Sequence, residues 1–432
     1  MGQAHTKDEG YQTVLSQDGL SGSAFQLKYV GGSRGQAGWT NKWAAVVRTK
    51  DGNDATVATA LSNDQARVGQ WVHLVAIHDA TAKNLTLYVN GKAQDTPAAA
   101  DMSTWTTSRG KFAIGRTLTA GSPGEYFNGE IDDVRVFDRA VTPSSVAGWY
   151  RPTVHARWRL NSPAGTDVAV PDDSGAGHTL TLNGGAEIKT DEETCVQLTG
   201  QCLALDGART SGGEWAQADP VVRTDGSFTI AGWVDAAKPT VPMTVFSAAG
   251  TKQSAFTVRF NPRAAKNPDW DPDRDDPADE YISRWEIEMP DKDGDDPVRL
   301  TAFHGQSCNI CTNSGPDHLA LTYEAATGTM TLYVNGTVDA SANNSSAKSD
   351  VIAFNAIGPV QVGRRLADGQ SADDHANREY FSGLIDDVWI LSGALTDKEV
   401  ARFANAQEMD TPNGNSPLPC TYDEATLECP DD

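Results

Sequence analysis

Apolar and polar residues alternate with a period of two along many short stretches of this chain. Clear cases are residues 25–30, 85–89 and 331–334, and the last two run directly into an Asn-Gly pair. A period of two puts every second side chain on one face of a β-strand, and Asn-Gly is a strong signal for a two-residue hairpin turn. We therefore expect tight hairpins at Asn90-Gly91 and Asn335-Gly336.

Strand signals of this kind dominate the whole chain. Further strands are expected at residues 71–78, 112–115, 131–137, 156–160, 228–234, 256–260, 284–288, 318–323, 360–362 and 385–391. After the strands that end near 137 and 391, a Thr followed by proline or acidic residues predicts one short helix each. The sequence therefore indicates an all-β protein with two short helices.

The chain carries one series of segments twice. Residues 125–134 read EYFNGEIDDV and residues 379–388 read EYFSGLIDDV, and each follows a TLYVNG hexapeptide, at 86–91 and 331–336. Because order and rough spacing also agree, a whole domain is duplicated.

The two copies differ at their beginnings. The stretch from about residue 154 to Val245 would have to fit into the thirteen residues before Val14 in the first copy. It cannot, so we expect the first copy to lack its N-terminal portion. Either Met1 is an internal start of a longer protein, or the missing strands come from elsewhere.

The repeat also sets the expected domain boundaries. Trp149-Tyr150 close the first copy and residues 156–160 open the second. The expected organisation is a truncated domain at 1–151, a complete domain at 152–405 with an irregular acidic insert at 261–297, and a C-terminal extension at 406–432.

Charge is distributed unevenly between the copies. The chain has a formal net charge of −23, but residues 1–151 carry +1 and the remainder carries −24. Such a charge disfavours binding to nucleic acid or to an anionic membrane. We find no apolar run of transmembrane length, and no signal peptide is visible in the first 40 residues.

Six cysteines, all after residue 151, fall in three close couples: Cys195 with Cys202, Cys308 with Cys311, and Cys420 with Cys429. Their even number and close spacing favour three local disulfides and an oxidising compartment. Zinc at Cys308 and Cys311 is the rival interpretation, but no second CxxC accompanies it.

Seven motifs in order carry a family resemblance. They are ARWRL at 156–160, DDSGAGHTL at 172–180, FTIAGWV at 228–234, the HLA strand at 318–320, LYVNG at 332–336, VGR at 362–364 and GLIDDV at 383–388. In this order they resemble laminin G-like (concanavalin A-like) jelly-roll modules of secreted bacterial proteins. The resemblance implies two antiparallel β-sandwich jelly rolls in tandem, the first N-terminally incomplete, in an extracellular or cell-surface protein.

The resemblance also implies a structural Ca²⁺ ion. It would be shared by the early Asp-x-Ser-Gly loop and the late Ile-Asp-Asp strand, with Asp172 and Asp386 as ligands and Asp173 and Asp387 as neighbours. Calcium prefers six to eight hard oxygen ligands, which suits carboxylates from distant segments. The alternative is that these carboxylates only cap turns by hydrogen bonding.

Tryptophans supply the candidate ligand contacts. Trp43, Trp158, Trp233 and Trp285 lie in alternating strands and are expected in the core. Four others lie in expected loops, where an indole ring could stack on a sugar: Trp39, Trp105, Trp215 and Trp270. Packing of each ring against its own loop is the simpler explanation.

No catalytic motif is apparent. Retaining glycosidases on jelly rolls of this shape use a Glu-x-Asp-x-x-Glu strand, and the closest string here, from Trp285 to Asp291, misses it. We therefore expect a non-catalytic module that binds carbohydrate or an extracellular protein. The alternatives are an assembly subunit whose first domain is completed by a partner chain, a purely structural spacer, and, less favoured, a glycoside hydrolase.

Overall fold

The structure of this chain is a computed structural model. It describes residues 2–4, 10–32, 38–52, 54–67, 69–103, 105, 110–161, 165–166, 169–190, 195, 200–207, 213–237, 241–267, 270–273, 280–304, 316–338, 347–366 and 378–405. The chain folds into two compact units. Unit 1 comprises Met1–Arg151 with Ala325–Thr327, and unit 2 comprises Pro152–Glu324 with Gly328–Asp432.

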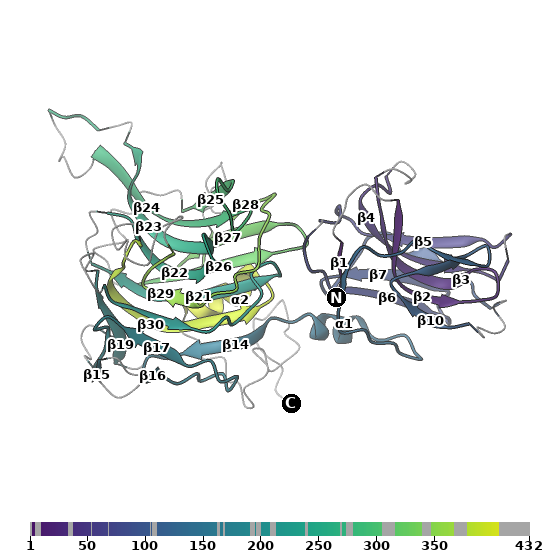
Figure 1. Ribbon diagram of the computed structural model, residues 1–432, viewed down its shortest axis with the longest axis horizontal. Coiled ribbons are helices and arrows are strands. Elements are labelled where there is room, and N and C mark those ends of the chain that lie inside the picture. The colour runs from purple at the N-terminus through teal and green to yellow at the C-terminus, as the bar shows by residue number, and fades with distance from the viewer. Residues whose placement is uncertain are drawn as a thin grey trace. The chain divides into compact units, whose positions relative to one another are not determined.

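Unit 2 is built from two large antiparallel sheets, which curve in parallel layers (Figure 1). The first sheet, sheet A, has the order β15-β18-β19-β30-β21-β26-β27-β28, and β14 also pairs with β30. Its strands are β14 (Thr153–Trp158), β15 (Gly165–Thr166), β18 (Glu187–Thr190), β19 (Gln201–Asp206), β21 (Phe228–Ala236), β26 (Asp317–Glu324), β27 (Thr329–Val334), β28 (Ala347–Lys348) and β30 (Ser382–Ser392).

The second sheet of unit 2, sheet B, has the order β16-β17-β20-β29-β22-β23-β24-β25. Its strands are β16 (Ala169–Val170), β17 (Leu180–Asn183), β20 (Trp215–Ala218), β22 (Met243–Ala249), β23 (Ser254–Lys266), β24 (Tyr281–Pro290), β25 (Arg299–Phe303) and β29 (Val360–Val362). Alternate residues of both sheets fill the space between them, including the fully buried Phe228, Phe256, Phe260 and Trp285. The expected core positions of Trp43, Trp158, Trp233 and Trp285 are confirmed.

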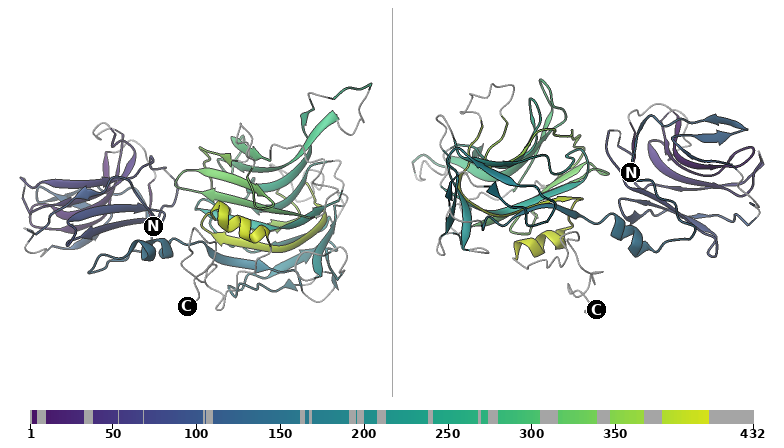
Figure 2. Two further views of the ribbon diagram at one scale, coloured as in Figure 1. Left: turned by 180° about the vertical axis from the view of Figure 1, so that it is seen from behind. Right: turned by 60° about the horizontal axis from the view of Figure 1, so that its bottom comes forward.

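A short helix covers the outer face of sheet A. Helix α2 (Asp397–Ala404) starts at Thr396, whose side chain accepts a hydrogen bond from the Glu399 amide, while Glu399 bonds back to Thr396. This reciprocal capping box stabilises the first turn. Phe403 then packs edge-on against Trp389 of β30, with ring centroids 5.0 Å apart. Figure 2 shows this helix lying across the sheet.

Unit 1 has a complete sheet on one side only. Its five-stranded sheet, the counterpart of sheet B, has the order β10-β2-β3-β4-β5, while the other strands form a four-stranded sheet of β6 to β9 and the pairs β1-β13 and β11-β12. The elements are β1 (Gly2–Ala4), β2 (Tyr11–Asp18), β3 (Ser23–Val30), β4 (Lys42–Arg48), β5 (Val57–Leu61), β6 (Leu74–Asp79), β7 (Asn84–Val89), β8 (Lys92–Ala93), β9 (Ala98–Ala99), β10 (Phe112–Ile114), β11 (Thr117–Thr119), β12 (Ser122–Gly124), β13 (Gly129–Ile131) and α1 (Pro143–Trp149).

The hairpin predictions are confirmed. Asn90 and Gly91 have φ of 49° and 76°, and Asn335 and Gly336 have φ of 50° and 76°. Two residues in succession with positive φ define the turn that Asn-Gly favours. The helices expected after residues 137 and 391 are likewise present as α1 and α2.

Two expectations from the sequence are wrong. The expected strand 131–137 ends at Ile131, because among the described residues of unit 1 nothing pairs with residues 132–137. The insert 261–297 is not irregular throughout, since β23 runs on to Lys266 and pairs there with the start of β24. A strand ladder continues wherever two segments stay adjacent, and the acidic composition between them does not prevent it.

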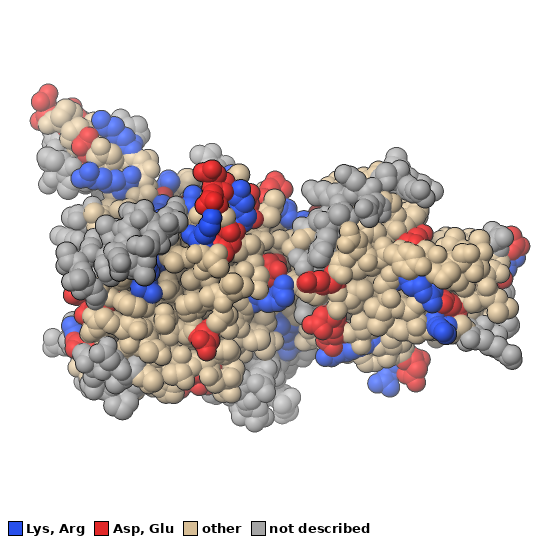
Figure 3. Space-filling view, in the orientation of Figure 1, with Lys and Arg blue, Asp and Glu red and all other residues tan. Residues whose placement is uncertain are grey.

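Within the described residues, we find no helix that is both long and apolar enough to cross a membrane. On the face in Figure 3, acidic and basic side chains lie beside each other and do not form an extended patch of one sign.

Candidate functional site

The expected calcium ligands meet around Arg157 of β14. Arg157 donates from its side chain to both carboxylate oxygens of Asp387, at 2.8 and 3.2 Å, and its guanidinium lies 4.0 Å from the centre of the Trp389 ring. Its backbone amide donates to Asp172 at 3.0 Å. Asp387 accepts a further bond from the Trp389 indole at 2.7 Å. An arginine therefore neutralises Asp387 in this structure.

Asp172 and Asp173 act as caps on the loop that follows β16. Asp172 accepts from the backbone amides of Ser174 and His178 as well as Arg157, at 2.8, 3.0 and 3.0 Å. Burial alone would raise the pKa of Asp172, but these hydrogen bonds prevail and lower it. Asp173 accepts a long bond of 3.3 Å from the Arg159 amide.

Asp386 differs from its neighbours because one oxygen is free. Its Oδ1 accepts from the Asp387 amide at 2.8 Å, whereas its buried Oδ2 has no hydrogen-bond partner among the described residues. Burial raises the pKa of Asp386 to about 7. The described residues contain no group of three or more acidic, His or Cys side chains that could hold a metal ion. Backbone carbonyl oxygens can also bind calcium, so the calcium prediction stays a prediction.

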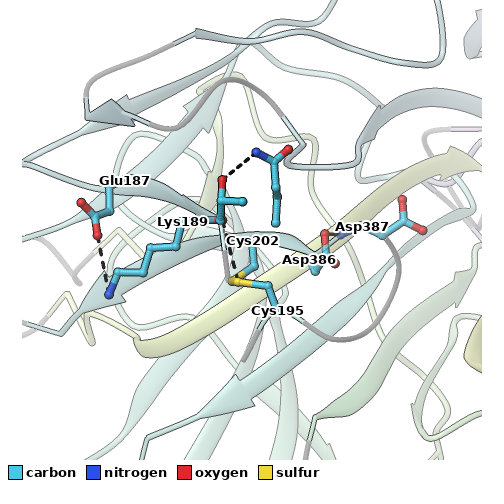
Figure 4. The surroundings of a disulfide bond; sticks show 8 residues. Glu187, Lys189, Cys195, Cys202, Asp386 and Asp387 are labelled. Carbon is cyan, nitrogen blue, oxygen red and sulfur yellow. Dashed lines mark hydrogen bonds and ion pairs between the residues drawn. A yellow bond between two sulfur atoms is a disulfide. The ribbon is translucent and has the colours of Figure 1, made fainter. Parts of the chain in front are cut away.

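The disulfide between Cys195 and Cys202 is confirmed. Figure 4 shows it near Asp386. Cys202 lies on β19, which pairs with β18, the strand that carries Glu187 and Lys189. The other predicted cysteine couples, Cys308 with Cys311 and Cys420 with Cys429, lie outside the described residues.

A hollow of about 520 Å³ lies in unit 2 near this disulfide. Glu187 and Lys189 flank the buried Ile188, so their side chains project from the face of β18 that points away from the core. The polar side chains around the hollow come from β18, β19, β21 and β30 and from the residue before β20: Glu187, Lys189, Asp206, Glu214, Asp235 and Ser382.

Electrostatics in the hollow are acidic but partly balanced. Lys189 lies 3.6 Å from Glu187. Glu214 accepts a hydrogen bond of 2.6 Å from the Asp206 amide. Burial raises the pKa of Glu214, and the nearby carboxylates of Asp206 and Glu187 add to that effect. The hollow thus offers several hydrogen-bond acceptors and one flexible cation.

Gly383 shapes one wall of the hollow. It has φ of +142°, and a Cβ at this position would collide with the Asp235 carbonyl oxygen. A residue without a side chain is required here, because β30 approaches β21 this closely.

The four tryptophans expected in loops do not line the hollow, and for Trp215 the loop prediction is wrong, because this residue begins β20. Trp39 packs against the cluster of Val30, Ala44 and Val46 in unit 1. Trp215 stacks under Arg364, whose guanidinium carbon lies 3.6 Å from the ring centre. Trp105 and Trp270 each make a local backbone bond, to Met102 and Asn267. Of the four, Trp215 comes nearest in sequence, directly after Glu214.

Charged side chains also cover the outer face of sheet B. Arg259 contacts Glu286 at 3.1 Å and Glu379 at 3.0 Å, and Arg284 contacts Glu286 at 2.8 Å. Arg299 lies 3.2 Å from Glu288. Burial raises the pKa of Glu288, and the surrounding arginines oppose this rise. Both carboxylates nearest to a glycosidase motif are therefore held by arginine.

Unit 1 keeps part of this arrangement on its own sheet. Thr13 and Lys28 both contact Glu125, at 2.9 and 3.1 Å, as Thr244 and Arg259 contact Glu379 in unit 2. The position opposite Lys28, however, is Ala44, whereas Glu286 stands opposite Arg259. At this one position the sheet face is apolar in unit 1 and charged in unit 2.

Sequence reasoning did not find the residues of the hollow. Alternation marks Glu187, Lys189 and Asp206 as solvent-facing, but many strands carry such residues. Only the pairing of β19 with both β18 and β30 brings them together.

Two packed antiparallel sheets, with a polar hollow beside a disulfide, define a concanavalin A-like sandwich. A family model described as the concanavalin A-like lectin/glucanases superfamily matches residues 5–147 and 210–401, and the chain belongs to this family.

Solved structures show weaker similarities. The binding domain of Paraclostridial mosquitocidal protein 1 is 14% identical with a TM-score of 0.39, over 59% of this chain and 52% of that one. The botulinum neurotoxin serotype D binding domain is 12% identical with a TM-score of 0.38, over 59% and 52%. Domain 4 of a GH43 extracellular arabinanase from Geobacillus stearothermophilus, solved with arabinotriose, is 16% identical with a TM-score of 0.37, over 59% and 98%.

The matched region thus spans about half the length of the two toxin domains. A comparison with curated proteins finds no match.

Proposed function

We propose that this chain is a non-catalytic extracellular module that binds carbohydrate in the hollow of unit 2. The family to which the chain belongs includes lectins, and the hollow is the observation that carries the proposal. An extracellular protein is the alternative ligand, and a glycan array separates the two ligand classes.

The chemistry of the hollow suits a sugar. Hydroxyl groups of a sugar donate hydrogen bonds, and the carboxylates of Asp206, Glu214 and Asp235 accept them. Lys189 can donate to a ring or hydroxyl oxygen. Asp206, Asp235 and Lys189 stand on paired strands, so their backbone is already ordered before a ligand binds.

The arginine contacts of Glu286 and Glu288 support a non-catalytic role. A retaining glycosidase needs one carboxylate free to attack and another that carries a proton. Salt bridges to Arg259, Arg284 and Arg299 occupy carboxylate oxygens of both Glu286 and Glu288.

The disulfide between Cys195 and Cys202 supports an extracellular or cell-surface location. Disulfides persist mainly in oxidising compartments. Calcium belongs to the same proposal as a structural ion near Asp386. Calorimetric titration of the chelated protein, compared with Asp386→Ala, tests that part.

A glycan array followed by titration calorimetry tests the carbohydrate proposal. We expect Asp206→Asn and Asp235→Asn each to weaken the binding of a glycan hit at least about tenfold, because each removes a charged acceptor. Asp295→Asn is the matched control, since Asp295 is an exposed acid that pairs with Lys252 away from the hollow.

Unchanged affinity in both hollow variants would contradict the proposal, and a protein ligand with no glycan hit would favour the alternative. Release of reducing ends from a polysaccharide, abolished in Glu288→Ala, would instead establish an enzyme. Absence of any ligand would favour a structural spacer.

A further inference from the structure

Strand β6 of unit 1 has an open edge. Its counterpart in unit 2, β26, pairs with β27 on one side and with β21 on the other. β6 pairs with β7, and among the described residues no strand lies along its other edge. Backbone N–H and C=O groups alternate along a strand, so about half of those in β6 point to this open edge.

The side chains of β6 are also more exposed than those of its counterpart β26. Leu319, Leu321 and Tyr323 of β26 are fully buried, whereas no residue of β6 is buried. Residues 133–137, the counterpart of 387–391 in β30, pair with no strand among the described residues either. Val136 is 63% exposed, while Ile390, which holds the equivalent position, is 1% exposed.

Strand β10, at the edge of the five-stranded sheet of unit 1, also exposes an apolar side chain that is buried in unit 2. Ile114 of β10 is 55% exposed, while the equivalent Val362 of β29 is fully buried. Apolar residues that form the core of one copy thus lie bare in the other. Soluble proteins rarely leave a contiguous apolar surface of this kind uncovered.

Strand β1 shows where the missing neighbour belongs. Gly2, Gln3 and Ala4 pair with residues 131, 130 and 129 of β13. In unit 2, Val234, Asp235 and Ala236 at the end of β21 pair with the equivalent residues 385, 384 and 383. Therefore β1 holds the last three positions of a strand equivalent to β21. None of the described residues holds the positions equivalent to 228–232, and these positions run between β6 and residues 133–137.

We propose that an added β-strand occupies this open position. The strand is an extended polypeptide segment, in line with β1 and antiparallel to β6, with apolar side chains at alternate positions. The segment lies outside the described residues, since none of the described strands takes this position. This inference is independent of the proposed carbohydrate site, which lies in unit 2.

The chemistry of the segment follows from β21. Its core-facing residues Phe228 and Ile230 are fully buried, and it bonds to β26 on one side and β30 on the other. An added strand in unit 1 would satisfy both open edges and join the pieces β1-β13 and β6 to β9 into one sheet. Main-chain bonds supply the affinity of such strand addition, and alternate side chains supply the specificity.

Hydrogen exchange of an extended chain tests the proposal. In the extended full chain, Met1 is replaced by Phe-Thr-Ile-Ala-Gly-Trp, copied from 228–233, so that this segment runs directly into Gly2. The control extension has serine in place of the Phe, Ile and Trp. We expect amides of residues 74–79 and 132–137 to exchange at least about tenfold more slowly with the apolar extension than with the control or without an extension.

Amides of β26 in unit 2 should be unchanged in all three proteins. Equal exchange in the two extended proteins would overturn the proposal. It would also fail if the unextended chain forms a stable dimer by light scattering and already protects residues 74–79, because a second copy would then occupy the edge.

Discussion

Burial strongly changes the pKa of one histidine in this chain, His318. His318 is 1% exposed on β26 and lies beside Trp233, with ring centroids 5.2 Å apart. Its Nδ1 has no hydrogen-bond partner among the described residues. Burial lowers the pKa of His318 to about 3, because a charged imidazole would lose its hydration there.

This burial predicts a pH dependence of stability. Unfolded chains bind a proton at histidine below pH of about 6.5, whereas folded His318 does so only near 3. Between these values the unfolded state holds more protons, so the free energy of unfolding falls as pH falls, by up to about 1.4 kcal/mol per pH unit.

Denaturant titrations of unit 2 at several pH values, compared with His318→Phe, measure this contribution. The variant should lose less stability than the wild-type chain between pH 6.5 and pH 4. Parallel curves for the two proteins would contradict the assignment.

Glycines in two hairpin turns allow other parts of the chain to approach the turn closely. Gly336 closes the β27 turn with φ of +76°, and a Cβ there would lie 2.9 Å from both Ala401 Cα and Ala404 Cβ of α2. The glycine therefore serves the turn and the close approach of the helix together. Its counterpart Gly91 in unit 1 similarly approaches Tyr150, at 3.0 Å.

Replacement of Gly336 separates these two roles. Gly175 has φ of +81°, and a Cβ added there would meet nothing within 4 Å, so Gly175→Ala should cost only the backbone strain of about 1 kcal/mol. Gly336→Ala should cost about 1–3 kcal/mol more, because the methyl group overpacks the helix contact. Equal losses in chemical denaturation would show that the helix moves away freely.

Asp51 in unit 1 and Asp293 in unit 2 make equivalent hydrogen bonds to the backbone of a hairpin turn. Asp293 accepts from the backbone amides of Thr251, Lys252 and Gln253 at 2.7–2.9 Å, and Asp51 accepts from those of Leu20, Ser21 and Gly22. Asp293, although it belongs to the acidic insert, thus closes the turn between β22 and β23.

The molecule as a whole consists of one complete sandwich and one with an open edge. Most of the largest fully buried side chains lie in unit 2, whereas unit 1 leaves Ile114 and Val136 exposed. Stability scales with buried apolar area, so the two units should differ in their resistance to heat.

Differential scanning calorimetry should show two transitions, with unit 1 unfolding first. Hydrogen exchange at a temperature between the transitions assigns them, since segments of 10–151 should exchange fully while β21, β26 and β30 stay protected. A single transition with uniform exchange would contradict this expectation.

Local patterns explain which features the sequence could predict. Alternation and the Asn-Gly pairs act over a few residues, so the strands, the turns and the duplication follow from them directly. Long-range pairing explains the failures. The arginine partner of Asp387 depends on β14 lying beside β30, and the hollow depends on β19 lying between β18 and β30. No sequence spacing encodes those neighbours.

The contrast between Ala44 and Glu286 on equivalent strands has a consequence for multivalent ligands. A chain that repeats one domain could engage a polymer at two identical sites and gain avidity. Here the two faces differ in charge at this position, so a ligand that contacts Glu286 in unit 2 would not find the same contact at Ala44 in unit 1. Duplication of the scaffold in this chain therefore does not duplicate the chemistry of this face.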